Sequence, residues 1–172
     1  MLKLIGAVMI FGSCAALGLS ARQSLRRRVA AADAMLLALS LIESEITCRR
    51  TPLPEIIGEL AENDDPVLRL VFGGLRRRLR EQDGLSLSYL WRANLRDCRA
   101  EAGLGAEECD ILCTAASYLG RYDADEQAAG LEQVSRRLSA ARAAADAALH
   151  SRGRLYRTCG VALGILVILV LI

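Results

Sequence analysis

Apolar residues recur every three or four positions along almost the whole chain, and no segment alternates with the two-residue period of a β-strand. From Arg22 to Ile46 this period gives one apolar helix face. The face consists of Leu25, Val29, Ala32, Leu36, Leu39, Ile42 and Ile46. Charged residues such as Arg27 and Asp33 fall off that face, as expected of an amphipathic helix that buries one side.

The same spacing predicts four shorter helices after this one. Their buried faces are Leu53, Ile56, Ile57 and Leu60; Leu68, Val71, Phe72, Leu75 and Leu79; Leu87, Leu90, Trp91, Leu95 and Cys98; and Ile111, Leu112, Ala115, Ala116 and Leu119. Thr51-Pro52 and Asp65-Pro66 each predict an N-cap followed by proline at the first helical position. Gly73-Gly74 weakens the middle of the helix from Pro66 to Arg80 and would permit a close helix crossing.

A long helix follows, and Asp123 with Glu126 three residues later predicts its capping box. Its apolar positions repeat every seven residues. They are Leu131, Val134, Leu138, Ala141, Ala145, Ala148 and Leu155. Because half of this seam is alanine, it buries little area, so we expect the helix to pack in a bundle rather than dimerise alone. The predicted fold class is therefore all-α, a small antiparallel helical bundle.

Two uncharged apolar runs lie at the ends of the chain, Leu4 to Ala21 and Thr158 to Ile172. A membrane-spanning helix needs about 17 to 25 residues. The first run is long enough, and the second reaches this length when Leu155 and Tyr156 join it. We therefore expect a transmembrane helix on each side of the bundle, with boundaries at residues 1–21, 22–157 and 158–172.

Arginines border both apolar runs on the side of the bundle. Arg22, Arg26, Arg27 and Arg28 follow the first run, and Arg152, Arg154 and Arg157 precede the second. By the positive-inside bias, the bundle is predicted to be cytosolic, on a cell membrane. A cleaved signal peptide and, at Cys14, a lipidation site are the alternatives for the N-terminal run, but the arginines that follow favour a retained anchor.

Composition narrows the possible functions. The net charge is only +2, with 22 basic against 20 acidic residues, so nothing in it calls for nucleic acid as a partner. There is no glycine-rich phosphate loop, and the single histidine, His150, lies far in sequence from Cys109 and Cys113. We expect the cysteines to be buried small residues in a reducing compartment. No catalytic, cofactor-binding or metal-binding residue and no small-molecule substrate is predicted, so we do not expect an enzyme.

Two clusters of charged residues could in principle form an acid/base site or a contact surface. Glu43 and Glu45 are two residues apart on a helix and point to different faces, which makes them a poor acid/base pair. Arg76, Arg77, Arg78 and Arg80 follow one another too closely on a helix to form one compact patch. A solvated outer face is the favoured interpretation of this run, with contact to a protein or to acidic lipid as the alternative.

Four stretches of the sequence resemble one family. They are Met1-Leu2-Lys3-Leu4-Ile5-Gly6-Ala7; Leu41-Ile42-Glu43-Ser44-Glu45-Ile46 leading to Thr51-Pro52-Leu53-Pro54-Glu55; Leu119-Gly120 with Asp123 and Gln127; and Arg154-Leu155-Tyr156-Arg157 with Gly160-Val161. Together they resemble the stage III sporulation protein AB family over essentially the whole chain. Cys48-Arg49-Arg50 and Tyr122 depart from the family pattern.

This resemblance implies a helical domain similar to those of the platform proteins of type II secretion and type IV pilus systems. It also implies a place in the secretion-like complex that links mother cell and forespore. The implied location is the outer forespore membrane on the mother-cell side, beside other membrane components and a cytosolic secretion-type ATPase, stage III sporulation protein AA. The implied function is structural: the bundle docks the ATPase and passes its motion to the membrane spans.

The predicted ATPase contacts are Glu43, Glu45, Arg49 and Arg50, because they cluster where the long first helix ends away from the membrane. A generic membrane-anchored scaffold or signalling adaptor without an ATPase partner is the alternative function.

Overall fold

The structure, a computed structural model, describes the backbone of residues 2–81, 84–119 and 124–171 and the side chains of residues 20, 22–81, 84–119 and 125–151. All regular structure in these ranges is helical, which confirms the all-α class. The elements are α1 (Leu2–Ser44), a π-helical turn η1 (Glu45–Arg49), α2 (Leu53–Ala61), α3 (Pro66–Glu81), α4 (Leu87–Ala102), α5 (Ala106–Ala115) and α6 (Ala124–Leu171).

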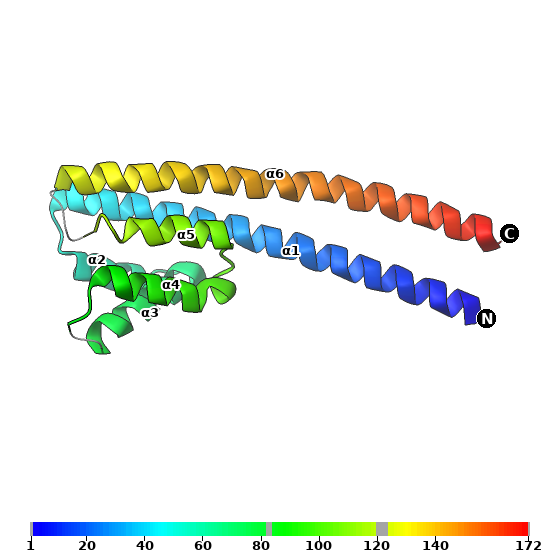
Figure 1. The fold of residues 1–172 in the computed structure, drawn as a ribbon, viewed down its shortest axis with the longest axis horizontal. Helices are drawn as coiled ribbons and strands as arrows, with labels where there is room; N and C mark the ends of the chain where they lie inside the picture. Colours follow the sequence, from blue (N-terminus) through cyan, green and yellow to red (C-terminus); the bar gives the residue numbers. More distant parts are fainter. Residues whose placement is uncertain (1, 82–83, 120–123, 172) are drawn as a thin grey trace.

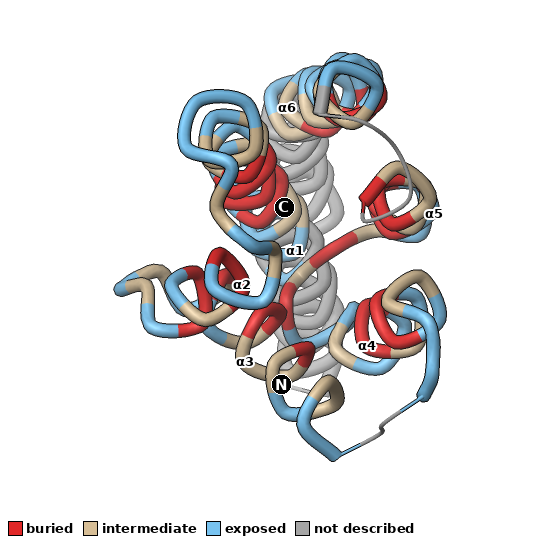
Figure 2. The backbone as a smooth tube through the Cα atoms, turned by 90° about the vertical axis from the view of Figure 1, so that its left-hand side faces the viewer, coloured by how far each residue is buried: buried red, intermediate tan, exposed pale blue. Residues whose placement is uncertain are grey.

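Helices α1 and α6 form a long antiparallel pair (Figure 1), and each packs more extensively against the other than against any other element. The first turn of α1 and the last turn of α6 lie at the same end of the molecule. We call the opposite end, where α1 finishes and α6 starts, the distal end. Helices α2 to α5 lie beside the distal half of the pair. Seen along the pair, the helices surround a common interior toward which the buried residues face (Figure 2).

Small residues and one ion pair join α1 to α6. The buried residues of the pair include Ala34 and Ala38 on α1 and Ala141 and Ala145 on α6, and such residues let helix backbones approach closely. At the same level, the Arg142 guanidinium donates to both carboxylate oxygens of Asp33, at 2.9 and 3.1 Å. This partly exposed, bidentate pair links α6 to α1, and Asp33 raises the pKa of Arg142.

Aromatic and amide side chains organise the core between α3, α4 and α5. The rings of Phe72 and Trp91 meet edge to face with centroids 5.6 Å apart. The Trp91 indole N–H donates to the Leu112 carbonyl oxygen at 2.8 Å, so the one polar atom of this buried side chain is satisfied. Trp91 therefore joins α4 both to α3 and to α5.

The predicted helix starts are partly confirmed. The Asp65 carboxylate accepts from the backbone N–H of Val67 and Leu68, so the N-cap of α3 is as expected. The cap of α2 is different: Pro52 occupies the N-cap position, and the Thr51 hydroxyl donates instead to the Glu45 carboxylate. The prediction of Thr51 as N-cap was wrong by one residue, because a tertiary hydrogen bond takes its hydroxyl. The predicted cap Asp123 lies outside the described residues.

The arginine run of α3 lies on a solvated face, as the sequence favoured. Arg76 pairs with Glu62 of the preceding loop region at 2.8 Å, and Arg78 pairs with Asp97 of α4. Arg77 and Arg80 are exposed. Two of the four cations are therefore used to tie α3 to its neighbours.

A buried carboxylate lies at the end of the bundle away from the distal end. Glu108, in the first turn of α5, is fully buried, and the Nε of Arg28 on α1 donates to it at 2.6 Å. Arg28 also approaches the exposed Glu107 at 3.5 Å. The second carboxylate oxygen of Glu108 has no hydrogen-bond partner among the described residues. The positive charge of Arg28 therefore offsets the unfavourable burial of the Glu108 carboxylate.

Replacing Arg28 with methionine should therefore destabilise the protein by about 3 to 5 kcal/mol, because an unpaired buried charge remains. The unfolding free energy of the full chain in detergent, followed by far-UV circular dichroism, measures this. Arg76→Met, which breaks an exposed pair, should cost less than about 1 kcal/mol. Adding Glu108→Leu to Arg28→Met should recover most of the loss. Equal losses for Arg28→Met and Arg76→Met would contradict this role.

The two adjacent glycines of α3 have different surroundings. A Cβ on Gly74 would collide with the side-chain amide of Asn94 on α4, whereas a Cβ on Gly73 would meet no atom within 4 Å. Asn94 is buried and donates to the Val71 carbonyl oxygen at 2.8 Å. The expected close crossing is therefore present and depends on Gly74 alone.

Gly74→Ala should destabilise the protein by about 1 to 3 kcal/mol, since the amide of Asn94 must move in a packed core. Gly73→Ala is the matched control, and it should stabilise the protein by up to about 1 kcal/mol through helix propensity. Thermal denaturation of the two variants distinguishes them. A stability change of the same sign in both would show that the α3–α4 crossing is not limited by Asn94.

Candidate partner-contact site

The distal end is shaped by the way α1 terminates. After Ser44 the helix widens into the π-turn η1, and Arg50 then adopts the left-handed conformation, with φ 53° and ψ 35°. The Glu45 carbonyl oxygen accepts from the backbone N–H of both Arg50 and Thr51. A non-glycine residue in this conformation costs on the order of 1 kcal/mol or more, so neighbouring contacts must hold the turn.

The Glu45 side chain supplies those contacts. Its carboxylate accepts from the Thr51 hydroxyl at 2.7 Å and from the Arg49 guanidinium at 3.0 Å. The side chain is only 14% exposed, whereas that of Arg49 is 75% exposed. The residues on either side of Arg50, Arg49 and Thr51, therefore both donate to the Glu45 carboxylate.

The four predicted contact residues thus differ in accessibility. Arg49 and Arg50 are exposed, Glu43 is half-buried, and the Glu45 carboxylate is occupied within the turn. Arg50 forms no ion pair with any residue whose side chain is described. The structure brings all four to the distal end, but it leaves the two arginines as the groups that protrude.

The start of α6 also lies at the distal end, which was not predicted from the sequence. The turn η1 packs against α6, whose first turn carries the exposed Asp125 and Glu126. From the sequence, Glu126 was assigned to the capping box of this helix. Only the antiparallel pairing of α1 and α6 places the two acids near Arg49 and Arg50, and no local pattern signals it. The distal surface, defined as Arg49, Arg50, Asp125 and Glu126, therefore carries both signs of charge.

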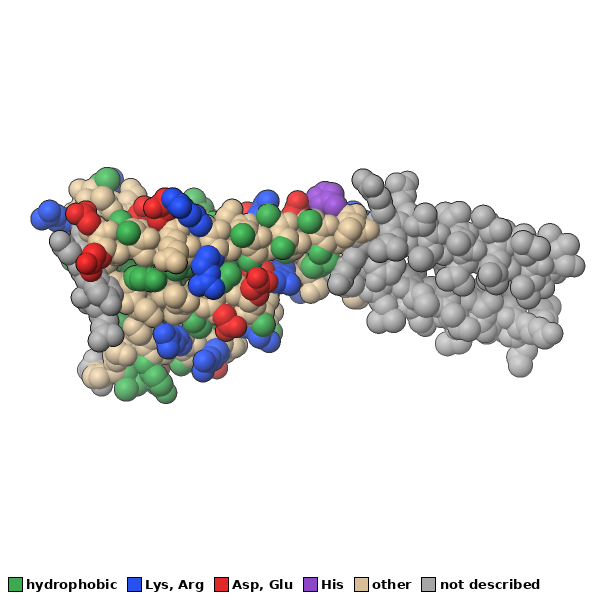
Figure 3. Space-filling view, turned by 45° about the horizontal axis from the view of Figure 1, so that its top comes forward, with side chains coloured by type: hydrophobic (Ala, Val, Ile, Leu, Met, Phe, Trp, Pro, Cys, Tyr) green, Lys and Arg blue, Asp and Glu red, His purple; other side chains and the backbone are tan. Residues whose placement is uncertain are grey.

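Charge is mixed over the rest of the molecule too. On the face shown in Figure 3, basic and acidic side chains are interspersed. Such a surface lacks the single-signed field that attracts a polyanion from a distance. The distal surface, which carries both signs of charge, does not present such a field either.

The described cysteines are poor nucleophiles apart from the exposed Cys48. Burial raises the pKa of both Cys98 and Cys109 to about 11 and also raises that of Cys113. Raised values disfavour the thiolate, which is the form that attacks electrophiles and binds metals. Within the described ranges, no three His, Cys, Asp or Glu residues are grouped as a metal site would require.

No helix is both long and apolar enough to cross a membrane within the part of the chain whose side chains are described. The two predicted spans, Leu4 to Ala21 and Thr158 to Ile172, lie outside that part except for Ser20. The backbone of α1 continues from Leu2 to Ser44 and that of α6 from Ala124 to Leu171.

Comparison with known proteins now identifies the family. A family model described as stage III sporulation protein AB matches residues 3–172. The chain belongs to this family. A solved structure named Stage III sporulation protein AB (SpoIIIAB) has a similar fold, with a TM-score of 0.60 and 23% sequence identity. The match covers 72% of this chain and 97% of that chain. A comparison with curated protein sequences gives no match.

Family membership confirms the resemblance inferred from the sequence and makes this chain a component of a sporulation complex. At 23% identity, the likeness to the solved structure concerns the fold. Neither comparison bears on the distal surface, so its residues stay a prediction.

The role of Glu45 in the turn can be tested by stability. Glu45→Ala should destabilise the protein by about 1 to 3 kcal/mol, because it removes two charge-assisted hydrogen bonds from a shielded carboxylate. Glu132→Ala is the control: it removes a Glu–Arg pair of the same i, i+4 spacing from an exposed part of α6, with an expected loss of about 0.5 kcal/mol. Chemical denaturation measures both. Equal losses would mean that Glu45 does not hold the turn.

Proposed function

We propose that this chain is a membrane-anchored platform component of the sporulation complex between mother cell and forespore. In this proposal it docks a cytosolic secretion-type ATPase, stage III sporulation protein AA, and couples it to the membrane assembly. The observation that carries the proposal is the uninterrupted antiparallel pair of α1 and α6, which connects the end bearing both termini to the distal end (Figure 1).

Two continuous helices suit the transmission of force. At 1.5 Å per residue, the 43 residues of α1 extend over about 65 Å and the 48 residues of α6 over about 72 Å. Neither helix contains a proline, which would kink it. The Asp33–Arg142 pair resists sliding of one helix along the other. A push at the distal end would therefore reach the opposite end of both helices together.

The membrane placement rests on the sequence. The uncharged runs at residues 4–21 and 158–172 serve as spans in this proposal, and the arginines that border them place the bundle in the cytosol. In this proposal the membrane is the outer forespore membrane, on the mother-cell side. The other membrane components of the complex would then contact the spans, and the ATPase would contact the distal surface.

Docking at the distal surface has structural support. Arg49 and Arg50 protrude from a turn that is fixed from inside by Glu45, so they are held in place without being buried. Preorganised charges lose little freedom when a partner binds. The exposed Asp125 and Glu126 add charges of the opposite sign, which favours a partner whose surface is also mixed. This role requires no catalytic residue.

Charge reversal tests the docking. Arg49→Glu/Arg50→Glu should weaken binding of the ATPase to the full chain in detergent or nanodiscs at least about tenfold, since two attractive contacts become repulsive. Arg136→Glu/Arg137→Glu is a closely matched control. Both pairs are adjacent exposed arginines, and Arg136 also pairs with a glutamate four residues earlier; its exposure is 76%, against 75% for Arg49.

Surface-immobilised ATPase and the two variants provide the measurement. The control should bind like the native chain. If Arg49→Glu/Arg50→Glu also binds like the native chain, the distal arginines are not the contact. If the native chain itself does not bind the ATPase, the chain is instead a membrane-anchored scaffold or adaptor.

A further inference from the structure

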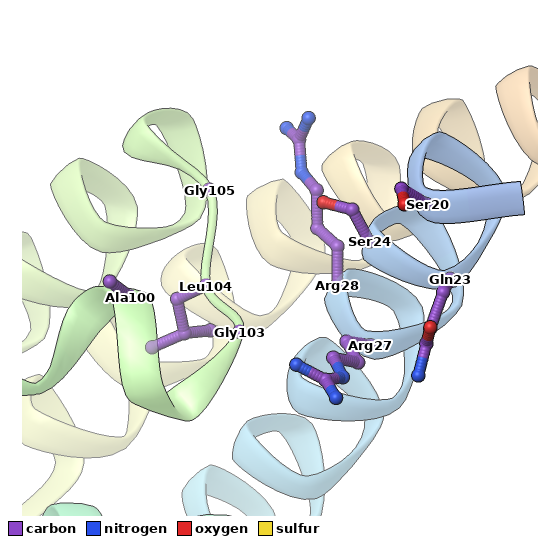
Figure 4. Close-up of a pocket in the computed structure, with 9 residues that line it drawn as sticks. All are labelled: Ser20, Gln23, Ser24, Arg27, Arg28, Ala100, Gly103, Leu104 and Gly105. Atoms are coloured by element: carbon purple, nitrogen blue, oxygen red, sulfur yellow. The ribbon is translucent and has the colours of Figure 1, made fainter. Parts of the chain in front are cut away.

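A cavity of about 500 Å³ lies between α1 and the connection from α4 to α5. It is at the opposite side of the bundle from the distal surface, where α1 leaves the bundle toward its first turn (Figures 1 and 4). One wall is a single face of α1, and the other is the backbone turn at residues 103–105. This cavity has no part in the proposed docking of the ATPase.

The side chains that α1 contributes are rich in hydrogen-bond donors. They are Ser20, Gln23, Ser24, Arg27 and Arg28. Spacings of three and four residues place them on one side of the helix. The Glu108 carboxylate lies behind this lining, where Arg28 compensates its charge. The groups that α1 contributes are two guanidinium groups, two hydroxyls and an amide. Such a lining is complementary to an anion rather than to a cation.

The two arginines are not equivalent. Arg28 is compensated by Glu108 and Glu107. Arg27 is exposed and forms no ion pair with any residue whose side chain is described. Figure 4 shows its guanidinium directed across the gap toward the wall at Gly103 and Leu104. The positive charge of Arg27 is therefore available to a ligand in the cavity.

Glycines keep the opposite wall close without filling the cavity. Gly103 has φ 78°, and a Cβ there would lie 3.2 Å from the Cβ of Arg27. At Gly105 an added Cβ would collide with the Glu108 carboxylate and the Arg28 guanidinium. The turn thus approaches α1 closely at its two glycines, with the Leu104 side chain between them. The ion pair behind the turn holds α5 in place. The cavity is preformed by the fold.

We propose that this cavity binds a phosphate group, held by the Arg27 guanidinium with Gln23 as a further donor. The planar guanidinium matches phosphate oxygens with two parallel hydrogen bonds. Because Ser20 is next to the end of the predicted span at residues 4–21, the cavity would open at the membrane surface, where acidic lipid headgroups carry such phosphates. This inference uses the membrane anchor of the proposed function and is independent of the ATPase.

The test uses the full chain in detergent micelles with two probes, phosphatidylglycerol and inorganic phosphate. Bound lipid is counted by native mass spectrometry, and phosphate is titrated as a competitor. Arg27→Gln should bind phosphatidylglycerol about tenfold more weakly, which corresponds to the loss of one charged hydrogen-bonding group. Arg77→Gln, at an exposed arginine of α3, should bind like the native chain.

Several outcomes separate the possibilities. Weakened lipid binding by Arg27→Gln, with competition by phosphate, supports a headgroup site. An effect of Arg27→Gln on phosphate alone supports a phosphate site whose ligand is soluble. If Arg27→Gln and Arg77→Gln bind both probes like the native chain, the proposal is overturned. Circular dichroism checks folding, and Gln23→Ala, which keeps the charge, should weaken binding severalfold if Arg27→Gln does not fold.

These results do not depend on the orientation of the chain in a membrane, because micelles have no sides. A failure of the anchor or of ATPase docking would therefore leave the phosphate titration interpretable.

Discussion

The antiparallel contact between α1 and α6 is the constraint on which the rest of the structure depends. The buried residues of the two helices include alanines such as Ala38 and Ala141 beside larger residues such as Leu39 and Leu138. The alanines let the two backbones approach closely. Alanine buries little apolar area, and a pair of this kind gains limited stability by itself. The Asp33–Arg142 pair and the packing of helices α2 to α5 beside α1 and α6 add to the stability of this contact. The large side chains Trp91, Phe72 and Met35 are buried in the interior that these helices share with the pair.

Much of the fold was predictable because it is encoded locally. The inner face of α3 at Leu68, Val71, Phe72 and Leu75 is buried as its period indicates, and Asp65 caps that helix. These features depend on residues within one turn of each other. Helix α5 ends at Ala115, four residues before Leu119, although Ala116 and Leu119 are still buried. Periodicity thus identified the buried side but not the point where the helix changes to turns.

The candidate site was less predictable, for a physical reason. The burial of Glu45 follows from the hydroxyl of Thr51, six residues away, and that of Glu108 follows from Arg28, 80 residues away. A sequence pattern assigns a glutamate to the surface because an unpaired buried charge is unfavourable. It does not reveal which distant cation makes burial acceptable. The donor-rich cavity at Arg27 escaped prediction similarly, since its second wall is contributed by glycines remote in sequence.

Asn94 gives α3 and α4 a fixed register. Its amide sits over Gly74 and donates to the Val71 carbonyl oxygen. If α3 slid along α4 by one helical turn, about 5.4 Å, the buried amide of Asn94 would lose its hydrogen-bond acceptor. We therefore expect α3 and α4 to move as one block in any rearrangement of the bundle, because sliding of one along the other breaks this contact.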